Sequence, residues 1–134
     1  MKNKKTLIIA EAGVNHNGRL RLAKKLVNLA ATAGADIIKF QSFETDQLTS
    51  KVSPKAKYQM KTTSKKESQY DMLKKYQLSY NDHLELKNYC NKKKIEFLST
   101  PFDLKSVILL KKLGLKRIKI SSGDINNLPL LKLI

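Results

Sequence analysis

The stretch LIIAEAGVNHNG, Leu7 to Gly18, runs apolar residues directly into a glutamate, followed by a glycine and an Asn-His-Asn cluster. Short apolar runs bounded by turn residues are typical of strands that are buried in a sheet. A strand that only fills a core has no use for Glu11 at its end. The stretch therefore predicts a buried strand whose carboxyl end carries chemistry.

Three further segments follow the same pattern: ADIIKFQSF (residues 35–43), IEFLSTP (95–101) and RIKISSGD (117–124). With residues 6–13 they give four expected strands, and helical patterns lie between them. Alternation of strands and helices is the signature of an α/β protein with a parallel sheet. We therefore expect one α/β domain, in which residues 44–66 form a long polar connection of a kind that is usually functional.

The helices between the strands carry recognisable end signals. Ser79 followed by Asp82 predicts a capping box, and Asp103 can cap the helix that follows it. Leu22, Leu26 and Leu29 keep helical spacing in the first helix, and Gly34 lies where that helix should end.

The composition of the chain narrows the classes of function that it can have. The chain has 134 residues and a formal net charge of +16, which comes almost entirely from lysine. Such a charge suits nucleic acid or anionic small molecules, but no aromatic residues interleave with the basic ones as in proteins that stack bases. No apolar run is long enough to span a membrane or to form a signal peptide core. With the single Cys90, this favours a cytoplasmic location.

Polar side chains gather at the carboxyl end of every expected strand. The candidates, in chain order, are Glu11, Lys39, Gln41, Thr100, Lys119, Ser122 and Asp124. Parallel α/β proteins place their active sites at this edge of the sheet. Lysines and hydroxyls on rigid strands suit a phosphate or carboxylate, and two carboxylates can orient sugar hydroxyls or act as general acid and base.

Simpler interpretations exist for several of these residues. Lys39 and Lys119 can extend from edge strands into solvent. His16, between two asparagines, is more often a turn residue bonded to backbone than a catalyst. His83 is expected on the surface, Cys90 is expected in the core, and no metal-ligand spacing is present.

Four motifs in order resemble those of the sialic acid synthase family: IAEAGVNHNG, GADIIKFQSF, IEFLSTPFD and KISSGDINNLPLL. The resemblance covers essentially the whole chain, including SQYDMLKKYQLS. Members of this family condense phosphoenolpyruvate with N-acetylmannosamine or a related amino sugar, in cell-surface carbohydrate biosynthesis. Their fold is a (β/α)8 barrel followed by a small antifreeze-like domain. The resemblance implies that residues 1–134 form the N-terminal half of such a barrel, about four β/α units, without the second half or the antifreeze-like domain.

The resemblance also implies roles for the candidate residues. Lys39, Thr100, Lys119 and Ser122 would contact phosphoenolpyruvate, and Gln41 and Glu11 would face the acceptor sugar. Asp124 stands where the family usually has the glutamate associated with the attacking water, and its shorter side chain puts efficient water activation in doubt. The family enzyme uses a divalent metal, manganese or magnesium, whose histidine ligands belong to the second half and not to this chain.

Two other functions remain open: a catalytically inactive remnant or interaction module and, more weakly, a basic nucleic-acid-binding domain. The resemblance implies phosphoenolpyruvate and an N-acetylated amino sugar as partners, and the motifs do not distinguish between amino sugars. A half barrel would expose unpaired strand edges, so we expect self-association or a complementary half barrel. The chain alone is expected to lack synthase activity.

Overall fold

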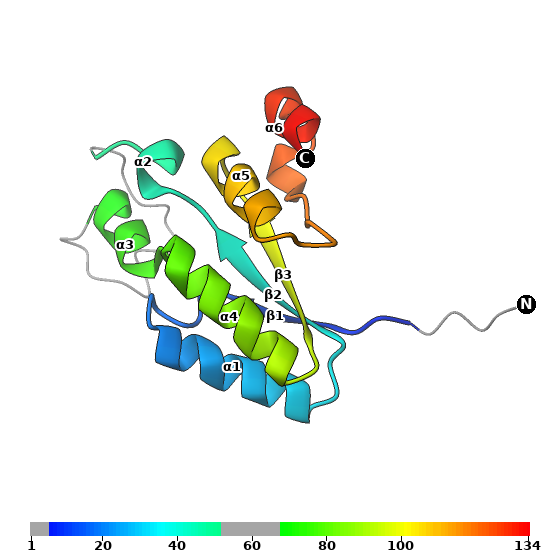
Figure 1. Ribbon diagram of the computed structural model, residues 1–134. Coiled ribbons are helices and arrows are strands. Elements are labelled where there is room, and N and C mark those ends of the chain that lie inside the picture. Colours follow the sequence, from blue (N-terminus) through cyan, green and yellow to red (C-terminus); the bar gives the residue numbers. More distant parts are fainter. Residues whose placement is uncertain (1–5, 52–67) are drawn as a thin grey trace, which may run out of the picture.

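The structure, a computed structural model, describes residues 6–51 and 68–134. Its centre is a three-stranded parallel sheet in the order β1-β2-β3, formed by β1 (Ile9–Gly13), β2 (Ile37–Ser42) and β3 (Glu96–Pro101) (Figure 1). The expectation of an α/β protein with a parallel sheet is confirmed.

The helices alternate with these strands. They are α1 (Leu20–Thr32), α2 (Thr45–Leu48), α3 (Gln69–Tyr76), α4 (Tyr80–Lys92), α5 (Leu104–Lys112) and α6 (Leu128–Leu133), with a 3-10 helix, η2, at Ser122–Asp124. Within the expected 44–66 connection, α2 forms a single helical turn, and residues 52–66 lie outside the described part.

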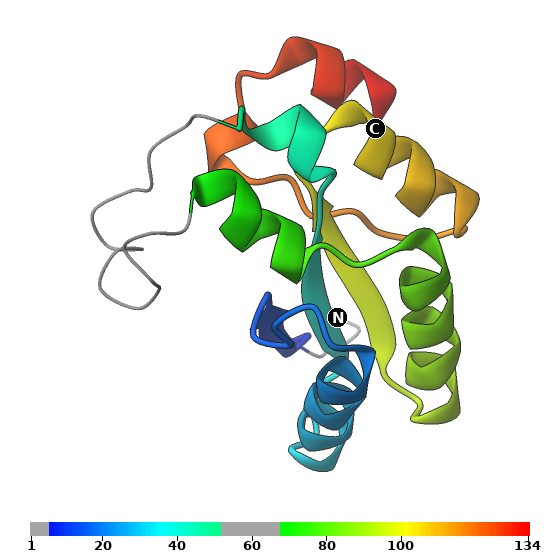
Figure 2. The same ribbon diagram turned by 90° about the vertical axis from the view of Figure 1, so that its left-hand side faces the viewer.

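Two helices, α1 and α4, lie side by side against the sheet, α1 across β1 and β2 and α4 across β3 (Figures 1 and 2). Small and branched side chains at helical spacing, Ala23, Val27 and Ala30, form the buried face of α1. They pack in one core with Phe40 and Phe97, whose rings stack at a centroid distance of 5.5 Å. Because successive residues of a strand point to opposite faces, this core identifies the helix-covered face of the sheet.

The predicted caps of α4 and α5 are confirmed. Ser79 and Asp82 form a reciprocal capping box, and the Asp103 carboxylate accepts a hydrogen bond from the Ser106 backbone N–H at 2.8 Å. The leucine stripe of α1 is only partly buried: Leu26 packs against the core, whereas Leu29 is 67% exposed.

The fourth expected strand does not form. Residues 117–121 belong to no helix or strand, and η2 follows them. One backbone hydrogen bond, from Lys119 N–H to the Ser99 carbonyl at 3.2 Å, joins the segment to β3. A ladder needs several such bonds in succession, so the count of four β/α units is not confirmed. Within the described ranges, no helix is long and apolar enough to cross a membrane.

Candidate functional site

Four of the candidate residues share the face of the sheet opposite α1 and α4. Glu11 is the Cα partner of Lys39 in the β1–β2 ladder, and Gln41 is the partner of Thr100 in the β2–β3 ladder. Their neighbours Ala12, Phe40 and Ser99 are buried and alternate with them along the strands. The three strands therefore present a carboxylate, an ammonium, an amide and a hydroxyl on one surface.

An ion pair joins the first two groups: the Lys39 ammonium contacts the Glu11 carboxylate. The Lys39 side chain is only 16% exposed, and the Glu11 side chain is 49% exposed. Gly13 leaves room beside them, because a Cβ at this position would lie 3.2 Å from Glu11 Oε1 and 3.8 Å from Gln41 Nε2. The backbone of Gly13 therefore approaches both polar side chains closely.

The hydroxyl of Thr100 is an unsatisfied group. Thr100 is 3% exposed, and its Oγ1 has no hydrogen-bond partner among the described residues. Buried hydroxyls in folded proteins nearly always have a partner, and those without one need an explanation. A bound ligand or water on this face would supply the missing partner.

The remaining three candidates lie on the segment that follows α5. The Lys119 ammonium donates to the carbonyl of neighbouring Ile120 at 2.7 Å, while its backbone N–H holds it beside the end of β3. Asp124, in η2, accepts from Asn127 Nδ2 at 3.1 Å, and Ser122 is exposed. The structure thus brings Glu11, Lys39, Gln41 and Thr100 onto one face, whereas the side chains of Lys119 and Asp124 form hydrogen bonds within their own segment.

His16 fits its simpler interpretation. Its Nδ1 accepts a hydrogen bond from the Gly18 backbone N–H at 3.0 Å, within the turn that follows β1. The ring is fully buried and its Nε2 has no partner among the described residues. Burial, with a smaller contribution from His83, lowers the pKa of His16 to about 4. The imidazole is therefore neutral near pH 7 and carries its proton on Nε2.

The expectation that His83 lies on the surface is wrong. His83 is 2% exposed and bonds the Ser42 hydroxyl through Nε2 at 2.8 Å and the Ser79 carbonyl through Nδ1 at 2.8 Å. Burial lowers its pKa. A polar residue in a first helical turn is usually solvated, but here the turn packs onto the ends of β2 and β3. The sequence analysis missed Ser42, although Ser42 directly follows Gln41 at the end of its strand.

The described residues do not fit a catalytic divalent metal. They contain no group of three or more His, Cys, Asp or Glu side chains that could hold one. Nδ1 of His16 and both ring nitrogens of His83 are engaged in hydrogen bonds with protein groups. Cys90 is buried in the core, as expected, and burial raises the pKa of its thiol to about 12, so it is a poor ligand.

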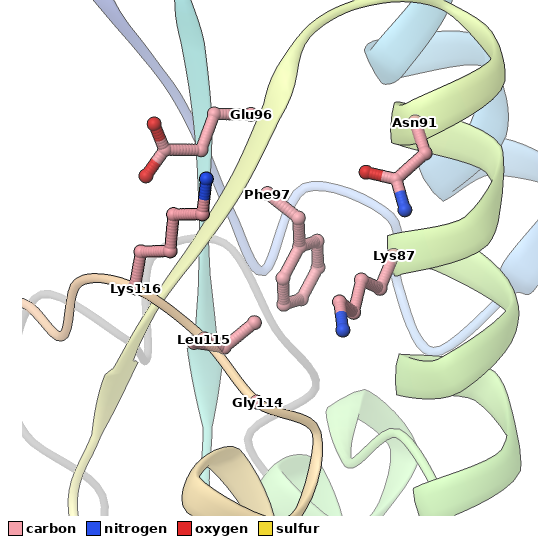
Figure 3. Close-up of a pocket in the computed structure, with 7 residues that line it drawn as sticks. All are labelled: Lys87, Asn91, Glu96, Phe97, Gly114, Leu115 and Lys116. Carbon is pink, nitrogen blue, oxygen red and sulfur yellow. The ribbon is translucent and has the colours of Figure 1, made fainter.

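A pocket of about 430 Å³ lies elsewhere, near the amino-terminal end of β3 (Figure 3). Lys87 and Asn91 of α4 line it, with Phe97 of β3 and with Gly114 and Lys116 from the segment after α5. The Lys87 ammonium donates to the Leu113 carbonyl at the end of α5, which is a helix-capping role. In parallel α/β folds this end of the sheet usually serves stability rather than catalysis.

Comparison with known proteins places this geometry in a family. The NeuB family model matches residues 26–134. The chain is 59% identical over 131 residues to an N,N'-diacetyllegionaminic acid synthase of Campylobacter jejuni, which covers 98% of this chain and 39% of that protein. It is 33% identical over 126 residues to an N-acetylneuraminate-9-phosphate synthase of Homo sapiens, which covers 93% of this chain and 34% of that protein.

A solved structure agrees. The crystal structure of an N-acetylneuraminic acid (sialic acid) synthetase from Leptospira borgpetersenii, in complex with citrate, matches with a TM-score of 0.79 and 35% identity over 98% of this chain and 41% of that chain. The chain therefore spans less than half the length of the relatives that it matches. Sequence and structure together show that this chain belongs to the NeuB family.

Proposed function

We propose that this chain supplies the phosphoenolpyruvate- and sugar-facing strands of a nonulosonic acid synthase. The observation that carries the proposal is the common face of Glu11, Lys39, Gln41 and Thr100 at the ends of three parallel strands. Relatives named as synthases of N,N'-diacetyllegionaminic acid and of N-acetylneuraminate-9-phosphate support it. The proposed substrates are phosphoenolpyruvate and an N-acetylated amino sugar, and the proposed setting is cytoplasmic carbohydrate biosynthesis.

The chemistry assigns a task to each group. The Lys39 ammonium and the unpartnered Thr100 hydroxyl bind the oxygens of the anionic substrate. Glu11 and Gln41 are placed to orient the hydroxyl and amide groups of the sugar. A bond then forms between the methylene carbon of phosphoenolpyruvate and the aldehyde carbon of the sugar, water adds to the resulting cationic carbon, and phosphate leaves.

Lys119, Ser122 and Asp124 complete the proposed site from the segment after α5. Lys119 and Ser122 add a charge and a hydroxyl for the anionic substrate, and Asp124 acts on the attacking water. The hydrogen bond between Lys119 N–H and the Ser99 carbonyl supports this, because it holds Lys119 next to Thr100. A divalent metal, manganese or magnesium, belongs to the proposed complete enzyme, and we assign its ligands to residues outside this chain.

A chimaera tests the proposal. Residues 1–134 are joined to the remainder of the Campylobacter jejuni synthase, and release of phosphate from phosphoenolpyruvate is measured with N-acetylmannosamine and its diacetylated analogues. We expect turnover that Thr100→Val lowers at least tenfold, because valine keeps the shape and removes the hydroxyl. Ser106→Ala removes a buried hydroxyl that bonds Asp103 instead, and it should leave turnover within twofold.

Two results would contradict the proposal. An inactive chimaera that is folded and binds metal would favour the remnant or interaction module. Equal turnover in the parent chimaera and Thr100→Val would show that the hydroxyl does not contact the substrate. The isolated chain, assayed in parallel, should release no phosphate.

A further inference from the structure

A hydrogen-bond network of buried polar groups lies behind the candidate site, on the helix-covered face of the sheet. The Ser99 and Ser42 hydroxyl oxygens are 2.7 Å apart, and Ser42 Oγ is 2.8 Å from His83 Nε2. His83 Nδ1 in turn lies 2.8 Å from the carbonyl of Ser79, the residue that caps α4. Ser42, Ser99 and His83 are each at most 2% exposed.

The hydrogen bonds in this network all have the same donor-to-acceptor direction, from Ser99 toward Ser42 and His83 and on to Ser79. The Ser79 carbonyl can only accept, so Nδ1 of His83 carries the ring proton and donates it. Nε2 is then the acceptor for the Ser42 hydroxyl, and Ser42 Oγ accepts from the Ser99 hydroxyl. Desolvation keeps the imidazole neutral, because it lowers the pKa of His83. Each of these side-chain groups therefore has a defined donor or acceptor role.

On β2 and on β3, the serine of this network is the immediate neighbour of a candidate site residue. Gln41 precedes Ser42, Thr100 follows Ser99, and Gln41 and Thr100 are Cα partners in the β2–β3 ladder. Successive strand residues point to opposite faces, so fixing the serines on one face fixes the direction of their neighbours on the other. Thr100 Oγ1 has no hydrogen-bond partner of its own in the described structure, so no hydrogen bond fixes its hydroxyl on the site face.

We infer that His83 is a positioning residue of the synthase site: through Ser42 and Ser99 it holds the ends of β2 and β3 so that Gln41 and Thr100 face the substrate. This inference rests on the proposed function, since the substrate is the one proposed above. His83 itself touches no substrate. Its part is to connect the capped start of α4 to the two strand ends.

The test uses Ser42→Ala, which removes the central oxygen and so breaks both hydrogen bonds with little change in volume. Ser106→Ala is the matched control, because it also deletes a buried hydroxyl with one side-chain partner, Asp103 at 2.8 Å. The first readout needs no ligand: nitrogen-15 spectra of the imidazoles and side-chain signals of Gln41 and Thr100. We expect His83 to be protonated on Nδ1, and Ser42→Ala to broaden or split the Gln41 and Thr100 signals.

The second readout is the Kd for phosphoenolpyruvate. Ser42→Ala should raise it about tenfold, whereas Ser106→Ala should leave it within twofold at a comparable loss of stability. His83→Gln, which keeps an acceptor toward Ser42, should restore most of the affinity that His83→Leu loses, and it provides the comparison if Ser42→Ala does not fold.

Two outcomes would overturn the inference: unchanged Gln41 and Thr100 signals in Ser42→Ala, or equal effects of Ser42→Ala and Ser106→Ala. If the unmodified chain binds no phosphoenolpyruvate, the proposed function fails. The ligand-free signals then still decide whether His83 orders the two strand ends.

Discussion

The ammonium of Lys39 pairs with the carboxylate of Glu11 across two adjacent strands, and the same two residues are Cα partners in the ladder. The pair places the carboxylate and the ammonium of the candidate strand-end group in contact with each other. A carboxylate beside the cation competes with any anionic substrate for that cation. We therefore expect Glu11 to lower the affinity of Lys39 for the proposed substrate phosphoenolpyruvate, because binding would have to share or open the pair.

Glu11→Gln should tighten the binding of phosphoenolpyruvate to the chain by about threefold to tenfold at low salt, because it removes the competing charge. Glu85→Gln is the matched control: it removes a carboxylate that pairs with Lys24 between α1 and α4. Both variants change the net charge equally. Calorimetric titration should find tighter binding for Glu11→Gln alone, and the gain should shrink as salt is added. Equal gains in affinity in both variants would show that the effect arises from net charge and not from the Glu11–Lys39 pair.

Stability should fall in mild acid. The pKa of His16 drops from 6.5 to about 4 on folding, so the unfolded chain binds the extra proton between these values. The contribution of neutral His16 to the free energy of unfolding is complete above pH 6.5. It is lost as the pH falls toward 4, by up to about 3 kcal/mol. The lowered pKa of His83 acts in the same direction, and the charge of Asp82 opposes both shifts.

Urea unfolding at pH 7, 6 and 5 measures this slope. His16→Asn keeps an acceptor for the Gly18 N–H and should flatten the slope. A free energy of unfolding that is constant from pH 7 to 5 would mean that His16 titrates normally in the folded chain.

Gly18 should be far less replaceable than Gly34. Both have positive φ, +69° and +79°, so alanine at either position carries backbone strain of about 1 kcal/mol. A Cβ on Gly18 would also lie 1.8 Å from the Lys75 carbonyl oxygen, near the end of α3, whereas a Cβ on Gly34 would meet nothing within 4 Å. Gly18→Ala should therefore cost at least twice as much unfolding free energy as Gly34→Ala. Equal losses in denaturant unfolding would show that α3 is not held against this turn.

Self-association should occur through the open edge of β1. Leu7, Ile8 and Ile9 are 49%, 56% and 48% exposed, and β1 pairs with β2 alone in the described sheet. An apolar groove of about 270 Å³ lies between this strand and α1. An exposed apolar edge favours pairing with another chain.

Sedimentation at two protein concentrations should therefore show a particle heavier than the monomer. Ile8→Glu should reduce association, while Leu84→Glu, on the exposed side of α4, should not. A monomer at every concentration would contradict this prediction.

The features that could be predicted from the sequence are those with a local pattern, namely apolar strand segments and helix caps. The apolar runs around Glu11, Lys39 and Thr100 form strands, and Ser79 and Asp103 cap their helices. Apolar runs and capping residues can be recognised from neighbouring residues alone. The segment with Lys119 was also expected to form a strand, but it makes only one backbone hydrogen bond to β3 among the described residues, and a strand requires a ladder of such bonds. His83 bonds Ser42, which lies 41 residues away in sequence, and the helical context of His83 gave no sign of that contact.

The most direct test of the account is the binding of phosphoenolpyruvate to the chain itself, followed by two-dimensional nuclear magnetic resonance. The account predicts saturable shifts concentrated at Lys39, Gln41 and Thr100. It also predicts that Lys39→Met weakens binding at least tenfold, while Lys25→Met, which removes an exposed lysine from α1, stays within twofold. Equal affinities for the Lys39 and Lys25 variants, or shifts spread over the basic surface, would contradict the claim that these strand ends form the anion site.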